Sequence, residues 1–212
     1  MIKDLRPEKA FIFRIVHREN LAWTLQHGVH ARSSGQVNPA YVDIGNPELI
    51  GKRNGRDIAV PPGGTLSDYV PFYFTPRSPM LLNIKTGRHV RQRGNDEIVI
   101  LVSSLPKIQE SGLDFLFTDR HAYLQTAEFH SDLARLDRID WDILQRSDFK
   151  RDNDDLGKFE RYQAEALIFQ HVPVSALLGI ACVNDAVAAQ LRQQIAAAGS
   201  ELKVAATPGW FF

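Results

Sequence analysis

Short runs of β-branched and aromatic residues alternate with polar stretches along the chain and predict a protein rich in strands. Such runs lie at 11–16, 41–44, 69–75, 97–103, 114–118, 165–169 and 177–183. The run at 97–103 is almost continuously apolar, which is typical of a buried strand. Pro71 has no N–H to donate to a neighbouring strand, so it favours a sheet edge or a bulge for the run at 69–75.

Helical patterns are fewer than strand patterns. They predict a helix over 21–26 that ends at Gly28, a helical turn near 48–53, one or two short helices within 132–148, and a longer helix from Asn184 or Asp185 to about Ala198. Segments 45–66 and 148–158 predict loops, and the C-terminal aromatic residues are expected to pack against the core. Because strands outnumber helices without regular alternation, we predict an α+β fold with a single domain over residues 1–212.

Composition narrows the class of protein. With 212 residues, 44% of them hydrophobic, the chain can bury a full core. It contains no run of roughly 18 apolar residues that could span a membrane and no signal-peptide pattern, so we expect a cytoplasmic protein without a membrane partner. The single cysteine, Cys182, excludes an internal disulfide and a cysteine-clustered zinc site.

The formal net charge is zero, but the charges are unevenly distributed. Residues 51–93 contain eight Lys/Arg and two Asp/Glu, a local charge of +6, whereas residues 94–212 carry a charge of −7. A protein that binds long duplex DNA without specificity is usually basic overall, so this class is not favoured. The basic segment fits a short polyanion held on one surface, and a solvated basic face is the alternative.

Two motif-like spacings do not meet the requirements of the sites they suggest. Residues 45–52 resemble a phosphate loop, but five residues separate the glycines, and Arg53 occupies the position of the Ser or Thr that would bind magnesium. His27 and His30 have no third ligand at a suitable spacing. We therefore expect neither a phosphate loop nor a metal centre.

Four features suggest chemistry, and each also has a purely structural explanation. His17 follows the first strand, with Asn20 close behind, but a histidine with satisfied hydrogen bonds is the alternative. Arg53 lies on a glycine-flanked loop that suits an anion, unless it is merely solvated. The aromatic segment 69–80 suits stacking on a base or on nicotinamide, or it forms core. Glu165 begins an apolar strand, where burial would require a partner, or it is an exposed carboxylate.

Together these features resemble a known family. The segment YVPFYFTPRSPM at 69–80 is similar to the signature of the DarT family of DNA ADP-ribosyltransferase toxins. IVHRENL at 15–21 with Gly28, the loop around Arg53, FTDRHA at 117–122 and RYQAE at 161–165 resemble further motifs of that family. The motifs occur in the family's order and cover most of the chain. Two leucines follow Met80, where many relatives have an aromatic residue.

The resemblance implies the split antiparallel β-sheet core of ADP-ribosyltransferases with flanking helices. It implies NAD as co-substrate, no metal, and transfer of ADP-ribose to a base of single-stranded DNA, with thymine as the first expectation and guanine as the alternative. Breaking the nicotinamide–ribose bond develops positive charge on the ribose, which a carboxylate stabilises. The implied partner is a DarG-like macrodomain antitoxin, and we expect a monomer.

By the same resemblance, Glu165 matches the catalytic glutamate and Arg53 the essential loop arginine, with Arg56 as the alternative. The residues expected to bind NAD are His17, Asn20, Gly28, Arg53 and Tyr73. The residues expected to bind DNA are mostly basic, and they are Arg56, Arg77, Met80, Lys85, Arg88, Arg91 and His121. Two other functions stay open: transfer to RNA or protein, and a single-stranded nucleic-acid-binding module that consumes no NAD.

Overall fold

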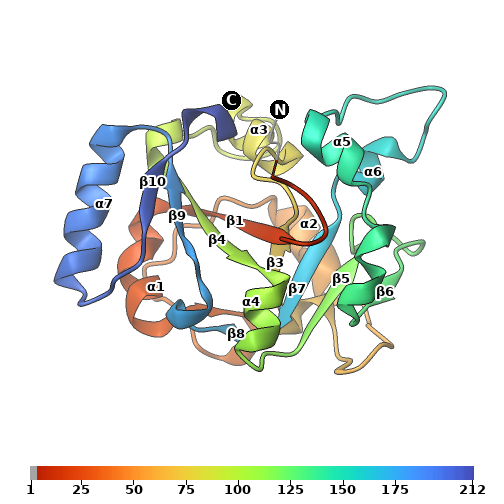
Figure 1. The fold of residues 1–212 in the computed structure, drawn as a ribbon, viewed down its shortest axis with the longest axis horizontal. Coiled ribbons are helices and arrows are strands. Elements are labelled where there is room, and N and C mark those ends of the chain that lie inside the picture. The colour runs from red at the N-terminus through yellow and green to blue at the C-terminus, as the bar shows by residue number, and fades with distance from the viewer. Residues whose placement is uncertain (1–3) are drawn as a thin grey trace.

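An eight-stranded sheet organises the computed structural model, which describes residues 4–212. From edge to edge, the strands are β10 (Val204–Ala206), β9 (Gly179–Cys182), β4 (Ile98–Ser104), β1 (Phe11–His17), β3 (Tyr69–Tyr73), β7 (Glu165–Phe169), β5 (Phe115–Thr118) and β6 (Phe129–His130). Neighbouring strands are antiparallel except for β10 and β9. A separate small sheet pairs β2 (Val29–His30) with β8 (His171–Val172). Figure 1 shows the large sheet in the middle of the molecule, with helices around it.

The large sheet is split between two of its central strands. β1 pairs with β4 along its whole length, and β3 pairs with β7 along its whole length. β1 and β3, however, pair only at Phe13 and Tyr73 and then diverge. Pro71 lies in the divergent part, where its carbonyl accepts a hydrogen bond from Arg14 Nη1 at 2.8 Å. The divergence leaves space between the two strands for side chains and a ligand.

The expectation that Pro71 marks a sheet edge or a bulge requires a correction, because β3 is an interior strand. The nitrogen and the carbonyl of one strand residue point to the same neighbouring strand. The missing N–H of Pro71 therefore faces β1, at a position where β1 has already moved out of hydrogen-bonding reach. A proline is tolerated in this interior strand because the split makes the position a local edge.

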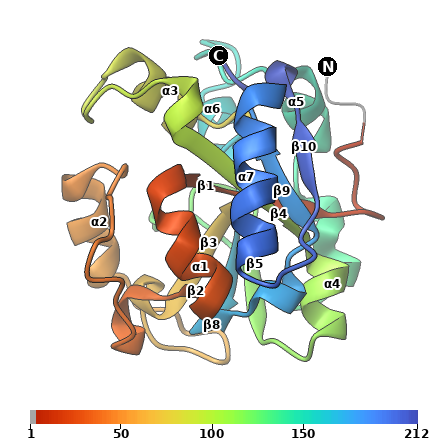
Figure 2. The ribbon, with the colours of Figure 1, turned by 90° about the vertical axis from the view of Figure 1, so that its left-hand side faces the viewer.

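Within residues 4–212, the α-helices are α1 (Leu21–His27), α2 (Pro47–Asn54), α3 (Pro79–Thr86), α4 (Leu105–Glu110), α5 (Trp141–Arg146), α6 (Lys158–Arg161) and α7 (Asp185–Ala197). Asn46 begins α2 by accepting a hydrogen bond from the Glu48 N–H at 2.9 Å. Ser78 and Pro79 begin α3. The sequence analysis does not predict α3, although this Ser-Pro pair is a signal for a helix start. Figure 2 shows α2 and α3 at the same side of the molecule.

Most predicted elements are confirmed. The runs at 11–16, 69–75, 97–103, 114–118, 165–169 and 177–183 contain β1, β3, β4, β5, β7 and β9, and α7 begins after an Asn184 cap. The segment 132–148 contains a 3-10 helix (Leu133–Arg138) and α5. The strand predicted at 41–44 is wrong, because this segment belongs to an irregular loop over residues 35–46. The backbone of Val42 bonds to the Asn20 side chain and not to another strand.

Buried apolar residues of β1, β3, β4, β7 and β9 form one continuous core. The C-terminal aromatic residues pack against it as predicted: Phe211 is buried, and the ring of Trp210 meets Phe13 edge-on, with 5.2 Å between centroids. Cys182 is buried and free. Among residues 4–212, no helix has the length and apolar character required to cross a membrane.

Candidate active site

A cavity of about 450 Å³ occupies the space where β1 and β3 diverge. Its walls come from β1, β3 and β7, from α2 and α3, and from the loop over residues 35–46. Val37 and Tyr41 of this loop are exposed at its border. A cavity of this size, with a few polar groups converging in it, is typical of a ligand site.

Glu165 faces the cavity from the start of β7, where it pairs with Tyr73 of β3. Its side chain is only 3% exposed. Arg53 Nη1 lies 2.8 Å from Oε2, and His121 Nδ1 lies 3.1 Å from Oε1. The backbone N–H of Ala122 donates to Oε1 at 3.0 Å. Burial on its own would raise the pKa of Glu165, but these three groups stabilise the charged form and hold the pKa at about 2. Glu165 is therefore a buried, ionised carboxylate.

Arg53 reaches Glu165 from the last turn of α2. Its Nη1 contacts the carboxylate, whereas its Nη2 is buried and forms no hydrogen bond within residues 4–212. A buried N–H without an acceptor is costly, so we expect a ligand atom to complete it. Arg14 Nε is a second buried nitrogen without a partner in the described part of the chain, and Arg14 also lines the cavity. These donors fit a ligand that is polar or anionic.

Tyr73 and Met80 form a less polar part of the wall. Burial raises the pKa of the Tyr73 hydroxyl well above its usual range, and the negative charge of Glu165 adds to the rise. The hydroxyl is therefore neutral at physiological pH, and it lies 3.8 Å from Met80 Sδ. This wall suits a flat ring, because a neutral tyrosine and a thioether both pack well against aromatic surfaces.

His17, at the end of β1, is not among the residues that line the cavity, and its contact with NAD stays a prediction. Its Nδ1 accepts a hydrogen bond from the Glu19 N–H at 3.3 Å. Its Nε2 is buried 3.5 Å from Glu97 Oε1 and forms no hydrogen bond within residues 4–212. His17 therefore retains a buried nitrogen that a ligand atom would complete.

Asn20 and Gly28 both line the cavity. The buried Asn20 amide donates to the Val42 carbonyl at 2.9 Å and accepts from the Val42 N–H at 2.8 Å. Both ends of this side chain thus hold the loop over residues 35–46 beside the cavity. Gly28 has a φ of +77°, and a Cβ at this position would lie 2.4 Å from His171 Nε2. A glycine is required here because of the positive φ and because there is no space for a Cβ.

Arg53 and Arg56, the two candidates for the essential loop arginine, have different environments, and these favour Arg53. Arg53 contacts Glu165, whereas Arg56 Nη1 donates to Gln125 Oε1 at 2.7 Å and its Nη2 donates to the Leu124 carbonyl at 3.3 Å. The head group of Arg56 is thus engaged by the loop that follows His121, and its contact with DNA stays a prediction.

Arg77 is also engaged within the protein. Its Nη1 donates to the carbonyls of Gly209 and Phe211 at 3.1 and 2.8 Å, and its guanidinium lies 4.2 Å from the centroid of the Phe212 ring. These contacts anchor the C-terminal segment, and the contact of Arg77 with DNA stays a prediction. The other predicted basic residues lie at or after the last turn of α3, with Lys85 half-buried and both Arg88 and Arg91 exposed.

Two further features of the site are missed by sequence analysis. The backbone N–H of Ala122 has no side-chain signal that a sequence pattern could reveal. Arg14 does have a sequence signal, because a charged residue within the apolar run at 11–16 requires either a partner or a function. Its position in the split between β1 and β3 makes it part of the cavity wall.

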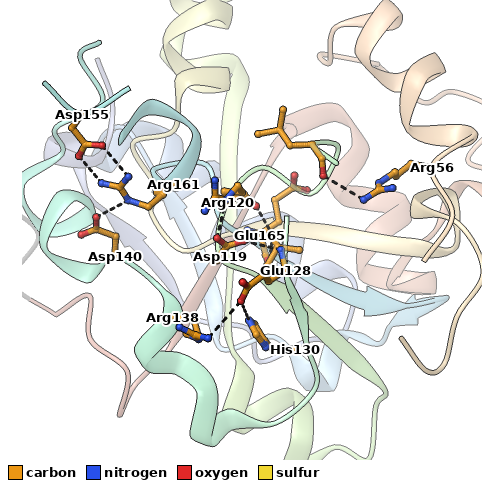
Figure 3. A network of polar contacts seen from close by, with 12 residues as sticks. Arg56, Asp119, Arg120, Glu128, His130, Arg138, Asp140, Asp155, Arg161 and Glu165 are labelled. Atoms are coloured by element: carbon orange, nitrogen blue, oxygen red, sulfur yellow. Dashed lines mark hydrogen bonds and ion pairs between the residues drawn. The ribbon is translucent and has the colours of Figure 1, made fainter. Parts of the chain in front are cut away.

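Ion pairs restrain the segment that leads into β7. Arg161 binds Asp140 at 3.0 Å and Asp155 at 2.6 Å, and Lys158 bridges two more aspartates of the same segment. Figure 3 shows the Arg161 pairs to one side of Glu165, with Arg56 on the other side of that view. These pairs fasten the charged loop predicted at 148–158 just before the strand that carries Glu165.

The split antiparallel sheet, which presents a buried, ionised glutamate to the cavity, agrees with the core of ADP-ribosyltransferases that the family resemblance implies. Comparison with known families agrees with this class: the model described as "ssDNA thymidine ADP-ribosyltransferase, DarT" matches residues 13–212. The chain belongs to the DarT family. It is an NAD-dependent DNA ADP-ribosyltransferase.

Relatives from several bacteria match almost the whole chain. A DNA ADP-ribosyl transferase of Escherichia coli O127:H6 is 52% identical over 210 residues, which are 99% of this chain and 96% of the relative. One from Thermus sp. strain 2.9 is 38% identical over 186 residues, or 88% and 87% of the two chains. The structure of Thermus sp. 2.9 DarT with ADP-ribosylated ssDNA matches with a TM-score of 0.90 and 32% identity, and covers 97% of this chain and 98% of that one. The structure with NAD+ matches with a TM-score of 0.87 and 32% identity, and covers 97% and 99%.

Proposed function

We propose that this protein transfers ADP-ribose from NAD to a thymine base in single-stranded DNA, releases nicotinamide, and acts as the toxin of a toxin–antitoxin pair. The observation that carries the proposal is the Glu165 carboxylate, held ionised beside Arg53 in a chain of this family. The Thermus relative solved with ADP-ribosylated ssDNA supports the choice of acceptor. The antitoxin is a DarG-like macrodomain protein, as the family resemblance implies.

Glu165 contributes to the reaction through its charge. Loss of nicotinamide develops positive charge on the ribose, and an ionised carboxylate in a site shielded from water stabilises that charge strongly. The same carboxylate can accept a hydrogen bond from a ribose hydroxyl. Burial alone would raise the pKa of Glu165, but Arg53 and His121 lower it and keep the carboxylate in the charged form that this role requires.

The donors and walls of the cavity account for both substrates. Arg53 Nη2 would donate to a carbonyl of the acceptor base as negative charge develops there, and Arg14 Nε would donate to an anionic part of NAD. Tyr73 and Met80 would pack against the rings, with His121 at the edge of the base. Phosphates of the DNA strand would lie along α3 and the loop that follows it, near Lys85, Arg88 and Arg91.

Mass spectrometry of a short single-stranded oligonucleotide, incubated with the protein and NAD, tests the proposed function. We expect a mass gain of one ADP-ribose, and fragmentation should place it on thymine. An oligonucleotide of matched length without thymine should gain nothing. If this oligonucleotide is modified on guanine, guanine and not thymine is the acceptor base. No gain in DNA of any sequence, with transfer to RNA or protein, would contradict the proposal.

Asn20→Ala is expected to weaken the binding of NAD. The substitution removes both hydrogen bonds to Val42, so the loop over residues 35–46 loses its attachment beside the cavity. Two hydrogen bonds of ordinary strength correspond to a rise in KM for NAD of roughly tenfold, with a smaller change in kcat. Steady-state kinetics at varied NAD concentration measures both. Gln26→Ala, on an exposed position of α1, is the matched control. An unchanged KM for NAD in Asn20→Ala would show that the loop does not hold this substrate.

A further inference from the structure

The groups around Glu165 come from two segments that lie outside the large sheet. Arg53 belongs to α2, whereas His121 and Ala122 belong to the irregular loop over residues 121–127. All of them must meet the same carboxylate within hydrogen-bonding distance. The relative position of α2 and this loop therefore determines whether the carboxylate is fully surrounded.

Arg56 connects the two segments directly. On one side, its N–H donates to the Arg53 carbonyl at 3.1 Å and its own carbonyl accepts from the Leu66 N–H at 3.0 Å, so its backbone is tied to α2 and to the 3-10 helix Leu66–Asp68 that precedes β3. On the other side, its guanidinium donates to Gln125 Oε1 and to the Leu124 carbonyl. Its Nε is buried and forms no hydrogen bond within residues 4–212, so the two contacts with the loop are made by Nη1 and Nη2.

The loop over residues 121–127 has another attachment at its beginning, where the His121 N–H donates to the Glu160 carbonyl at 3.1 Å. Arg56 holds the middle of the loop, at Leu124 and Gln125. A planar guanidinium makes both hydrogen bonds at once in a fixed geometry, which a lysine ammonium does not reproduce. The contact thus depends on arginine itself and not only on positive charge.

We propose that Arg56 is a positioning residue that holds the loop over residues 121–127 against α2, so that His121, the Ala122 N–H and Arg53 surround Glu165 at the same time. The inference rests on the proposed role of Glu165 in the transfer reaction. The role differs from contact with a DNA phosphate, for which a lysine would serve almost as well as an arginine.

Arg56→Lys separates the two roles. If Arg56 positions the loop, Arg56→Lys lowers kcat by roughly 10- to 100-fold, in line with the cost of small misplacements in an active site, and leaves KM for DNA nearly unchanged. Loss of the donors around Glu165 also raises its pKa, so the acidic limb of the pH–rate profile moves to higher pH. Gln125→Ala should show a smaller effect in the same direction, and combining it with Arg56→Lys should add little. Arg146→Lys, at an exposed position of α5, is the matched control.

The opposite pattern overturns the inference. In that pattern, Arg56→Lys has the kcat of the parent protein. Arg56→Gln has a raised KM for DNA, and its binding of DNA depends less on salt. These results would show that Arg56 contacts a DNA phosphate. Amide hydrogen exchange tests the geometry without catalysis. We expect Arg56→Lys to speed exchange at the Ala122 N–H and its neighbours, and unchanged exchange there contradicts the inference even in a protein that transfers no ADP-ribose. An inactive parent protein with faster exchange in the variant would contradict only the proposed function.

Discussion

Replacing Glu165 by glutamine is expected to lower kcat for the transfer of ADP-ribose to DNA by roughly a thousandfold. Glutamine keeps the size of the side chain and an oxygen that can accept from the Ala122 N–H, but it removes the negative charge that opposes the positive ribose. Because the carboxylate is buried, little solvent screens this charge, and its loss is felt almost fully. Single-turnover reactions with labelled NAD and a thymine-containing oligonucleotide measure the rate.

The control for this prediction is Glu201→Gln, which removes an exposed carboxylate and should leave kcat unchanged. Circular dichroism and the unfolding midpoint show whether Glu165→Gln is folded. A folded Glu165→Gln protein with kcat within tenfold of the parent would refute the electrostatic role of this residue. The catalysis would then have to come from Arg53 and the other groups of the cavity.

Arg53→Gln is expected to produce the second large effect, on both activity and stability. It removes the nearest cation from a buried carboxylate, and breaking a buried ion pair in this way costs about 3 to 5 kcal/mol of unfolding free energy at neutral pH. Transfer to DNA should fall as well, because the free Nη2 donor is lost. Urea unfolding at several pH values, together with the transfer assay, measures the two effects.

The pH dependence of this loss follows from the pKa of Glu165. In the parent protein, the pKa is about 2 in the folded state against an ordinary value of 4.5. The lowered pKa therefore stabilises the fold by about 3 kcal/mol above pH 4.5, and this stabilisation disappears as the pH falls from 4.5 towards 2. Arg53→Gln removes the largest of the causes that lower this pKa, so the pKa of Glu165 rises in the variant. The stability difference between parent and variant should thus be largest near pH 7 and shrink on acidification.

Lys52→Gln is the matched control for Arg53→Gln, because Lys52 is the preceding residue of α2 and forms only an exposed ion pair with Glu48. Its effect on the unfolding free energy should stay below about 1 kcal/mol, with little dependence on pH. Equal stability losses for the two variants would show that the Arg53–Glu165 contact does not control the ionisation of the carboxylate.

The charged groups around Glu165 are held in place by both the sheet and the segments beside it. The sheet supplies rigid positions for Glu165 and Tyr73, whereas the groups that surround Glu165 come from α2 and from the loop over residues 121–127. The split between β1 and β3 then gives a ligand access to the interior without breaking the core. Pro71 contributes to this arrangement, since it cannot donate the hydrogen bond that would close the split there.

Features that depend on residues close together in the chain could be predicted from residue types. Runs of β-branched and aromatic residues predicted most strands, the Asn184 cap predicted the start of α7, and the irregular order of elements indicated an α+β fold. The motifs around Arg53 and Glu165 indicated the family, since a motif is a local pattern of residue types. The strand expected at 41–44 failed because a short apolar run needs a partner strand, and residue types alone do not provide one.

The contacts between these residues could not be predicted, because they depend on how distant parts of the chain fold together. Arg53 and Arg56 lie three positions apart and have the same chemistry, yet one contacts Glu165 and the other contacts Leu124 and Gln125. The structure also brought the Ala122 N–H into contact with the carboxylate. The physical reason is that a hydrogen bond depends on positions within a few tenths of an ångström, between groups such as Arg53 and Glu165 that are 112 residues apart in the chain.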